Sequence, residues 1–309
     1  MRNARIPGLW HYAASRPHCH QPAHAIDAIS SCKMAEMALQ QRRAPWQPSP
    51  TDPTEPTISA RALAKARGTV EDFARSYMPL LGLPVDDVLC FADSLYFVAG
   101  SLYELDELNE RGGDPSQAPA AEALRQFLAG RGLLDDVQAT LDVGYDYWTL
   151  ERRLIAEWKR PRGDAAHEDA LLRSACRASA CKSFDYHVLA LLVARLTART
   201  VSEEMMLFLG ACFQLVEIED DLKDYEKDHE KGAFNIYAAF VRRYGAAAPD
   251  RLRVWIAERE KYYLEKRTVL TEEQLKFHVE RNEAQGGAGP AMAPVACSGG
   301  WRLPTPILS

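Results

Sequence analysis

The chain has 309 residues, of which 47% are hydrophobic and 26% are charged, so it can bury a sizeable core. Its formal net charge of -6, from 37 Lys and Arg against 43 Asp and Glu, argues against a nucleic-acid partner, which needs a basic face. No run approaches the ~18 apolar residues of a membrane helix. The 7 cysteines are scattered and form no CxxC pair, as is typical of a reducing compartment. We therefore expect a cytoplasmic protein without a membrane span.

The two ends of the chain differ from its middle. Residues 44–57 read APWQPSPTDPTEPT, and prolines at this density prevent helix formation. Residues 283–309 are aperiodic and rich in Gly, Ala and Pro. We expect residues 1–57 and 283–309 to be disordered around a folded domain at 58–282. Residues 1–33 also resemble an organelle transit peptide in being poor in acidic residues, and the alternative is a true start at Met34 or Met37.

The middle of the chain has the apolar periodicity of helices nearly throughout. Apolar residues recur at spacings of three and four in the segments 59–77, 86–109, 120–129, 135–158, 167–199, 202–231, 236–244 and 249–267. Glycine and proline mark most of the breaks between them, and Ser202 is a predicted N-cap. No segment alternates as a strand does. The sequence predicts an all-α bundle of about eight helices.

Near the end of segment 202–231 the acidic residues fall where a helix should disfavour them. Asp220, Asp224 and Asp228 share one face, and Glu217 lies in the same arc. Like charges four residues apart cost a helix ~0.2–0.5 kcal/mol per pair. The helix is expected to end at Gly232, so the macrodipole adds a further penalty.

A second acidic cluster lies at the end of segment 86–109. Asp106 and Glu110 share a face just before the predicted helix stop at Gly112. The same helix carries an apolar and aromatic stripe made of Leu95, Tyr96, Val98, Ala99, Leu102 and Tyr103. A divalent cation bound by carboxylate oxygens would offset both the like-charge repulsion and the dipole penalty in each cluster.

An ordinary solvated helix face is the alternative interpretation. Lys223, Lys227 and Lys231 each follow an aspartate by three residues and could form surface ion pairs. Against this, the apolar face of the same helix continues directly into the carboxylates. That face consists of Leu207, Gly210, Ala211 and Gln214. The pattern favours a pocket with a metal-binding rim.

These residues carry a resemblance to a known family. Residues 220–228, DDLKDYEKD, resemble the second metal motif of class I terpene cyclases, in which Asn/Asp, Asp and an aliphatic residue precede Ser/Thr and a final Glu. Residues 106–110, DELNE, are similar to the first, aspartate-rich motif of that family, and the order of the motifs is the same. The resemblance covers about residues 60–280 and also includes Gly232, Asn235 and Ile236.

The resemblance implies a class I isoprenoid-synthase-like helical bundle with a central apolar cavity. It implies a Mg²⁺-dependent lyase that ionises a linear prenyl diphosphate, with farnesyl diphosphate expected, and cyclises the carbocation to a terpene. Three Mg²⁺ ions are expected, with Mn²⁺ as a substitute, in a monomer or homodimer. Carried over by position, Asp106 and Glu110 would bind two ions, and Asp220, Asp224 and Asp228 the third.

Substrate contacts follow from the same resemblance. A basic residue upstream of the second motif would contact the diphosphate; the candidates are Arg173, Arg177 and Lys182, of which Arg177 is preferred as a catalytic residue beside Asp106 and Asp220. Lys227 would also bind substrate. The aromatic wall would include Tyr103 and Phe97, with Tyr96, Phe184 and Tyr186 as further candidates that plain core packing also explains.

The sequence also departs from the family pattern. Asp224 stands where Ser or Thr is usual, Asp228 stands where Glu is usual, and the two motifs are closer together than expected. No Arg-Tyr pair occurs near the C-terminus, where the sequence has Trp301 followed by Arg302. Two alternatives therefore stay open. One is a chain-elongating or head-to-head prenyl diphosphate synthase of the same fold, and the other is a catalytically silent helical homologue.

Overall fold

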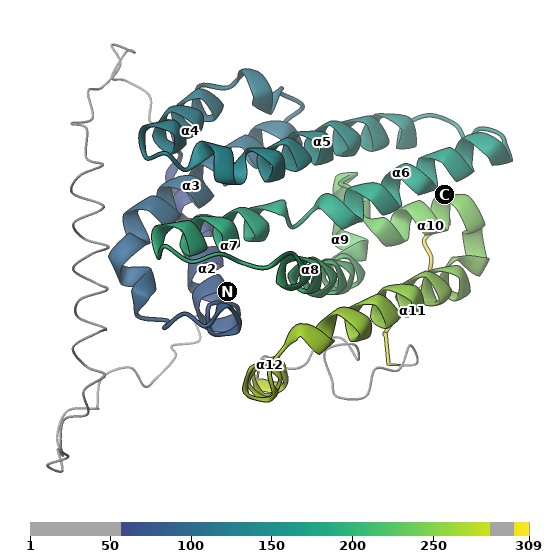
Figure 1. The fold of residues 1–309 in the computed structure, drawn as a ribbon. Coiled ribbons are helices and arrows are strands. Elements are labelled where there is room, and N and C mark those ends of the chain that lie inside the picture. The colour runs from purple at the N-terminus through teal and green to yellow at the C-terminus, as the bar shows by residue number, and fades with distance from the viewer. Residues whose placement is uncertain (1–56, 285–299, 309) are drawn as a thin grey trace, which may run out of the picture. The chain divides into compact units, whose positions relative to one another are not determined.

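The computed structural model describes residues 57–284 and 300–308. The chain divides into two units, residues 1–43 and 44–309, and all described residues belong to the second. The disorder expected for residues 1–56 and 285–299 lies outside the described residues. Within the described part every regular element is a helix and none is a strand, which confirms the predicted all-α class (Figure 1).

The helices follow the predicted segments closely, with short 3-10 turns between some of them. They are α2 (Ala60–Ser76), α3 (Asp87–Glu110), α4 (Pro119–Gly130), α5 (Leu134–Trp158), α6 (Ala165–Cys181), α7 (Phe184–Leu196), α8 (Glu203–Lys223), α9 (Tyr225–Lys231), α10 (Ile236–Tyr244), α11 (Ala248–Lys266) and α12 (Glu272–Ala284). Side-chain caps fix several starts: Ser59 accepts from the Ala62 N–H, and the predicted cap Ser202 accepts from the Met205 N–H.

Three features of this helix set differ from the sequence prediction. The segment 167–199 is divided at Lys182 and Ser183 into α6 and α7. The segment 202–231 is divided at Asp224 into α8 and α9, so the three aspartates do not lie on one continuous helix. The helix α12, which follows the last predicted segment, was not predicted, because its weakly apolar sequence has no clear helical periodicity.

The core lies between α8 and the helices around it. In Figure 1, α8 is seen end-on between α7 and α11, and it contacts α6, α7, α10 and α11. Helix α3 packs against α2 on one side and α7 on another, while α5 packs on α6 and α7. At Gly144 of α5, an added Cβ would lie 2.3 Å from the Phe184 ring, so this glycine allows α5 and α7 to approach closely. These packed helices form the walls of the site described below.

Helix α3 is the single helix in the described ranges that is long and apolar enough to be a membrane-span candidate. Half of its apolar window is buried inside the fold, as in the core helix of a globular protein. Its apolar residues are therefore explained by packing against α2 and α7.

The expectation of a disordered tail at 283–309 is wrong for residues 283–284, which end α12, and for residues 300–308, which have no regular secondary structure but pack against the helices. Trp301 is buried, and its indole N–H donates to Glu260 Oε1 at 2.8 Å. Tyr237 Oη donates to the Pro304 carbonyl at 2.8 Å, and the Ile307 N–H donates to Tyr225 Oη at 3.0 Å. One buried aromatic ring and these hydrogen bonds anchor a segment whose composition suggested no order.

Candidate active site

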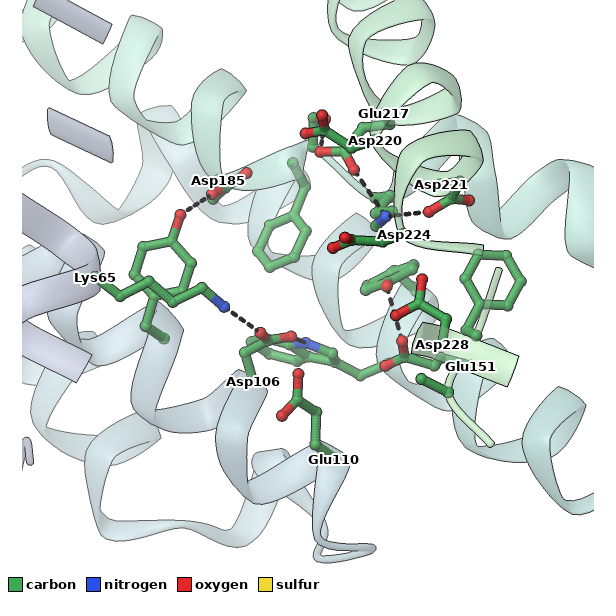
Figure 2. A pocket seen from close by; sticks show the side chains of 18 of the residues that line it. Lys65, Asp106, Glu110, Glu151, Asp185, Glu217, Asp220, Asp221, Asp224 and Asp228 are labelled. Atoms are coloured by element: carbon green, nitrogen blue, oxygen red, sulfur yellow. Dashed lines mark hydrogen bonds and ion pairs between the residues drawn. The ribbon is translucent and has the colours of Figure 1, made fainter. Parts of the chain in front are cut away.

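A cavity of about 810 Å³ lies among α2, α3, α5, α7, α8 and α9 (Figure 2). It is lined by all five predicted metal-binding residues, namely Asp106, Glu110, Asp220, Asp224 and Asp228. The last residues of α3 face the junction of α8 and α9 across this space. Two acidic clusters that are distant in sequence therefore share one opening.

On the α3 side, Asp106 already has two donors. Lys65 Nζ of α2 lies 3.1 Å from Asp106 Oδ2, and the Trp148 indole N–H of α5 donates to Asp106 Oδ1 at 3.1 Å. Glu110 lies one helical turn further on. Burial, and to a lesser extent repulsion from Asp106, raises the pKa of Glu110. A cation entering beside these two carboxylates would relieve that repulsion.

On the opposite side, Asp220 lies in the last turn of α8, Asp224 at the junction of α8 and α9, and Asp228 on the short helix α9. Burial and the neighbouring Glu217 raise the pKa of Asp220 to about 6. Asp224 is the residue at which α8 ends, and its carboxylate is 2.8 Å from Lys227 Nζ. Asp228 follows on α9 and accepts from Asn235 Nδ2 at 3.1 Å. Each aspartate thus reaches the cavity from a different position along a broken helix.

The neighbouring Asp221 is a structural residue. It is 3% exposed, and Lys182 Nζ lies 2.7 Å from its Oδ1. Its other oxygen, Oδ2, accepts from the N–H of Ile236, the first residue of α10, at 2.8 Å. Asp221 therefore holds α8, α10 and the α6–α7 break together beside the cavity, and its carboxylate is not free to bind a metal.

The cations that line the cavity are all lysines within the described ranges, namely Lys65, Lys159, Lys182, Lys227 and Lys231. Lys182 lies between two carboxylates, 2.7 Å from Asp221 and 2.9 Å from Glu217, and these raise its pKa well above the ordinary value. About a quarter (24%) of its side chain stays accessible, toward the cavity. It therefore remains a protonated amine at the wall of the site.

The preferred diphosphate contact, Arg177, does not line the cavity, and neither does Arg173. Both are exposed on α6, and Arg177 pairs with Asp146 of α5 at 2.8 Å. The face of α6 that is turned toward the core carries the small residues Ala175 and Ala178, so Arg173 and Arg177 lie on the solvent-facing side of the same helix. Of the three basic candidates, the structure brings only Lys182 to the cavity, because it lies at the break after α6.

The inner walls of the cavity are aromatic but also carry buried carboxyl groups, so the interior is less apolar than expected. Tyr103, Phe184, Tyr186 and Phe213 line it, and Phe184 packs edge-on against Trp148 with ring centroids 5.2 Å apart. The expected substrate contact Phe97 is not among the lining residues. Its ring packs on Phe127 of α4 at a centroid distance of 4.4 Å, which is an ordinary packing role.

Several cavity residues escaped the sequence analysis. Lys65 lies on α2, Glu151 on α5 and Asp185 at the start of α7, and all three line the cavity. Burial and repulsion from Asp106 raise the pKa of Glu151 to about 7. A signal existed for Glu151 alone, since it lies one turn after Tyr147 and Trp148 on the inner face of α5. Lys65 and Asp185 are isolated charges that no spacing distinguishes.

The donor set suits Mg²⁺, which prefers carboxylate oxygens and retains several waters. Asp106 and Glu110 lie in the last turn of α3, and Asp224 ends α8, so anionic groups face the negative ends of two helices. In the described part of the chain, no three potential ligands are already gathered as a preformed metal site. The geometry is that of separate carboxylates around an open space that a cation and its waters could bridge.

Comparisons with family models, with curated proteins and with solved structures found no match to this chain.

Proposed function

We propose that the chain is a Mg²⁺-dependent class I terpene cyclase with the helical isoprenoid-synthase fold. One observation supports this most: Asp106 and Glu110 on α3 face Asp220, Asp224 and Asp228 across one cavity whose inner walls are aromatic. The proposed substrate is a linear prenyl diphosphate such as farnesyl diphosphate, and the products are a cyclic terpene and pyrophosphate. A cytoplasmic monomer or homodimer belongs to the same proposal.

The mouth of the cavity suits the charge of such a substrate. Bound Mg²⁺ would supply Lewis-acid stabilisation of the departing pyrophosphate, held by the carboxylates of the two clusters. Lys65 and Lys227 now pair with Asp106 and Asp224, at 3.1 Å and 2.8 Å. If these carboxylates held Mg²⁺ instead, the flexible amines of Lys65 and Lys227 would be available to phosphate oxygens. Lys182 is oriented by Glu217 and Asp221, and in this proposal it would make the diphosphate contact expected of Arg177.

The interior of the cavity suits a prenyl chain. Its volume of about 810 Å³ lies within the range of ligand pockets, which is roughly 300–1,000 Å³. Tyr103, Phe184 and Phe213 present aromatic rings to this space, and such rings attract a cation while excluding water. The chain would fold against these rings with its diphosphate at the acidic mouth.

The test is incubation of the full chain and Mg²⁺ with geranyl, farnesyl and geranylgeranyl diphosphates, with pyrophosphate release and products followed by mass spectrometry. We expect a cyclic hydrocarbon or alcohol from one substrate. Asp106→Ala and Asp220→Ala should each lower turnover at least 100-fold. The matched control is Glu122→Ala on α4, an exposed carboxylate that pairs with Arg125 and should leave turnover unchanged.

Other outcomes would overturn the cyclase proposal in distinct ways. Longer diphosphates that form only with added isopentenyl diphosphate would identify a chain-elongating synthase. Coupling of two prenyl chains would identify a head-to-head synthase. An absence of turnover, together with no Mg²⁺-dependent stabilisation by pyrophosphate, would identify a catalytically silent homologue.

A further inference from the structure

The cavity contains a carboxyl group that the metal and diphosphate chemistry leaves unused. Asp185 is the second residue of α7 and follows the helix break at Lys182 and Ser183. It is half-buried and lines the cavity together with the aromatic side chains of Tyr103 and Tyr186, away from the labelled aspartates of the second cluster (Figure 2). It is therefore placed to meet the hydrocarbon part of a ligand.

The hydrogen bonds of Asp185 orient its carboxylate and stabilise its ionised form. Tyr103 Oη donates to Oδ2 at 2.9 Å, and the Tyr186 N–H donates to Oδ1 at 2.9 Å. Thr69 Oγ1 lies 2.6 Å from Tyr103 Oη and can donate to it, which completes a chain of donors that ends at Asp185. Two donated hydrogen bonds hold the group in one orientation.

Asp185 also lacks the lysine partner that Asp106, Asp221 and Asp224 each have. Throughout the described ranges, no lysine or arginine lies within ion-pairing distance of it. Burial and the neighbouring Glu217 raise its pKa to about 7, while the bonds from Tyr103 and Tyr186 oppose the rise. A buried carboxylate of this kind has a strong electrostatic preference for a cation brought in by a ligand.

We propose that Asp185 binds the carbocation formed in the cavity and accepts the proton whose loss ends the reaction. This inference rests on the proposed cyclase function. A C–H bond next to the cationic carbon breaks, its electron pair becomes the second bond of an alkene, and the proton forms an O–H bond with Asp185. The carboxylic acid then returns its proton to water when the product leaves.

The pH dependence of this step has a definite sign. Asp185 accepts protons only when it is ionised. The fraction of product formed as the alkene should therefore fall as the pH drops below about 7. Other titratable or charged groups line the same cavity on the helices around Asp185: Lys65 and Asp72 on α2, Tyr103 and Asp106 on α3, Tyr147 and Glu151 on α5, Tyr186 on α7, and Glu217 on α8, with Lys182 at the α6–α7 break. A variant at Asp185 itself isolates its contribution from theirs.

The first experiment measures binding without turnover, by calorimetry with N,N-dimethylfarnesylamine and with farnesol. The protonated amine imitates the cation, and the alcohol is its neutral counterpart. We expect Asp185→Asn to bind the amine at least tenfold more weakly than wild type, and farnesol equally well. Asn keeps the size and can keep the Tyr186 bond. Asp146→Asn, an exposed carboxylate on α5, is the matched control and should leave both affinities unchanged.

The second experiment compares products of wild type and Asp185→Asn with Mg²⁺ and the accepted diphosphate. We expect pyrophosphate release to continue and to fall by a smaller factor than the yield of the main alkene, because the metal-assisted ionisation takes place at the mouth, away from Asp185. The main alkene should fall at least tenfold in favour of alcohols or alkenes from earlier cations, and its dependence on pH near 7 should disappear.

Failure of this inference is distinguishable from failure of the proposed function. An Asp185→Asn variant that binds the amine as tightly as wild type, or that forms the same products with the same pH dependence, overturns the role of Asp185 alone. Wild type that releases no pyrophosphate from any prenyl diphosphate overturns the cyclase function and the proton transfer with it.

Discussion

Lys182 Nζ lies 2.7 Å from Asp221 Oδ1 and joins the break between α6 and α7 to the last turn of α8. The same amine lies 2.9 Å from Glu217, so one lysine forms ion pairs with two carboxylates. Asp221 is 3% exposed and depends on this cation for its charge balance, because its own burial raises its pKa. The pairing fixes the second acidic cluster, at the end of α8, relative to the break between α6 and α7.

Removing this amine should destabilise the fold. Lys182→Met leaves Asp221 and Glu217 enclosed without a cation, and loss of one partner of such a pair costs about 3 kcal/mol. Urea unfolding followed by circular dichroism measures the change. The Lys182→Met/Asp221→Asn double variant should recover about 1 kcal/mol, because it removes one of the stranded charges. Equal stability of Lys182→Met and wild type would contradict a structural role for the pair.

Acidification should destabilise the protein through His278 of α12. This residue is 2% exposed, lies 2.8 Å from Tyr263 Oη, and burial lowers its pKa to about 4. The imidazole binds a proton near pH 6.5 in the unfolded chain but not in the folded protein. The contribution of His278 to the free energy of unfolding is therefore fully present above pH 6.5 and is lost as the pH falls toward 4. At pH 5 the loss from this group should be about 2 kcal/mol.

The comparison that isolates His278 is wild type against His278→Gln, unfolded by urea at pH 7.5 and pH 5. The raised pKa values of Asp185 and Glu151 act in the opposite direction over this range, and they are common to both proteins. The variant should therefore lose about 2 kcal/mol less than wild type on acidification. Parallel losses in the two proteins would show that His278 titrates normally.

The C-terminal segment should contribute substantially to stability through Trp301. Trp301→Ala removes a buried ring and should cost about 3 kcal/mol. Trp301→Phe keeps most of the ring but leaves Glu260, 4% exposed, without the indole N–H, and should cost about 1–2 kcal/mol. Leu308→Ala, at a side chain that is 60% exposed, is the control and should change stability by less than about 0.5 kcal/mol. Thermal unfolding separates the three cases.

Two helix-interior glycines should respond in opposite directions to alanine. Gly144→Ala places a methyl group 2.3 Å from the Phe184 ring, and the resulting overpacking should cost about 1–3 kcal/mol. Gly68→Ala in α2 meets no atom within 4 Å and should stabilise the protein by about 0.4–1 kcal/mol. Melting temperatures measured side by side check both, and a stabilising Gly144→Ala would contradict the described contact between α5 and α7.

Apolar periodicity predicted most helices because each one buries a stripe along its length. It did not predict the breaks at Lys182 and Asp224, where neither glycine nor proline interrupts the sequence. At Asp224 the neighbouring contacts are tertiary: Asn235 Nδ2 donates to the Asp221 carbonyl at 2.6 Å and to the Asp228 carboxylate at 3.1 Å. Contacts of this kind join distant residues and leave no local pattern.

The two acidic clusters at the cavity, Asp106 with Glu110 and Asp220 with Asp224 and Asp228, were predictable because charge at a helix end is anomalous in the sequence itself. The choice of Arg177 over Lys182 illustrates the limit. Treating 167–199 as one helix gave no reason to separate the two, whereas the break places Lys182 at the cavity and leaves Arg177 on the surface. Asp185 was missed because its partner Tyr103 lies on another helix.

The use of lysine alone among the basic residues lining the described cavity has a practical consequence. Unlike guanidinium groups, primary amines react readily with acylating reagents once they lose a proton. The amines of the cavity can therefore be labelled chemically without introducing new residues. Lys227, with 56% of its side chain exposed, should be modified quickly, whereas Lys182, held by two carboxylates, should be modified slowly. Peptide mass mapping after brief labelling would follow occupation of the cavity residue by residue, without a functional assay.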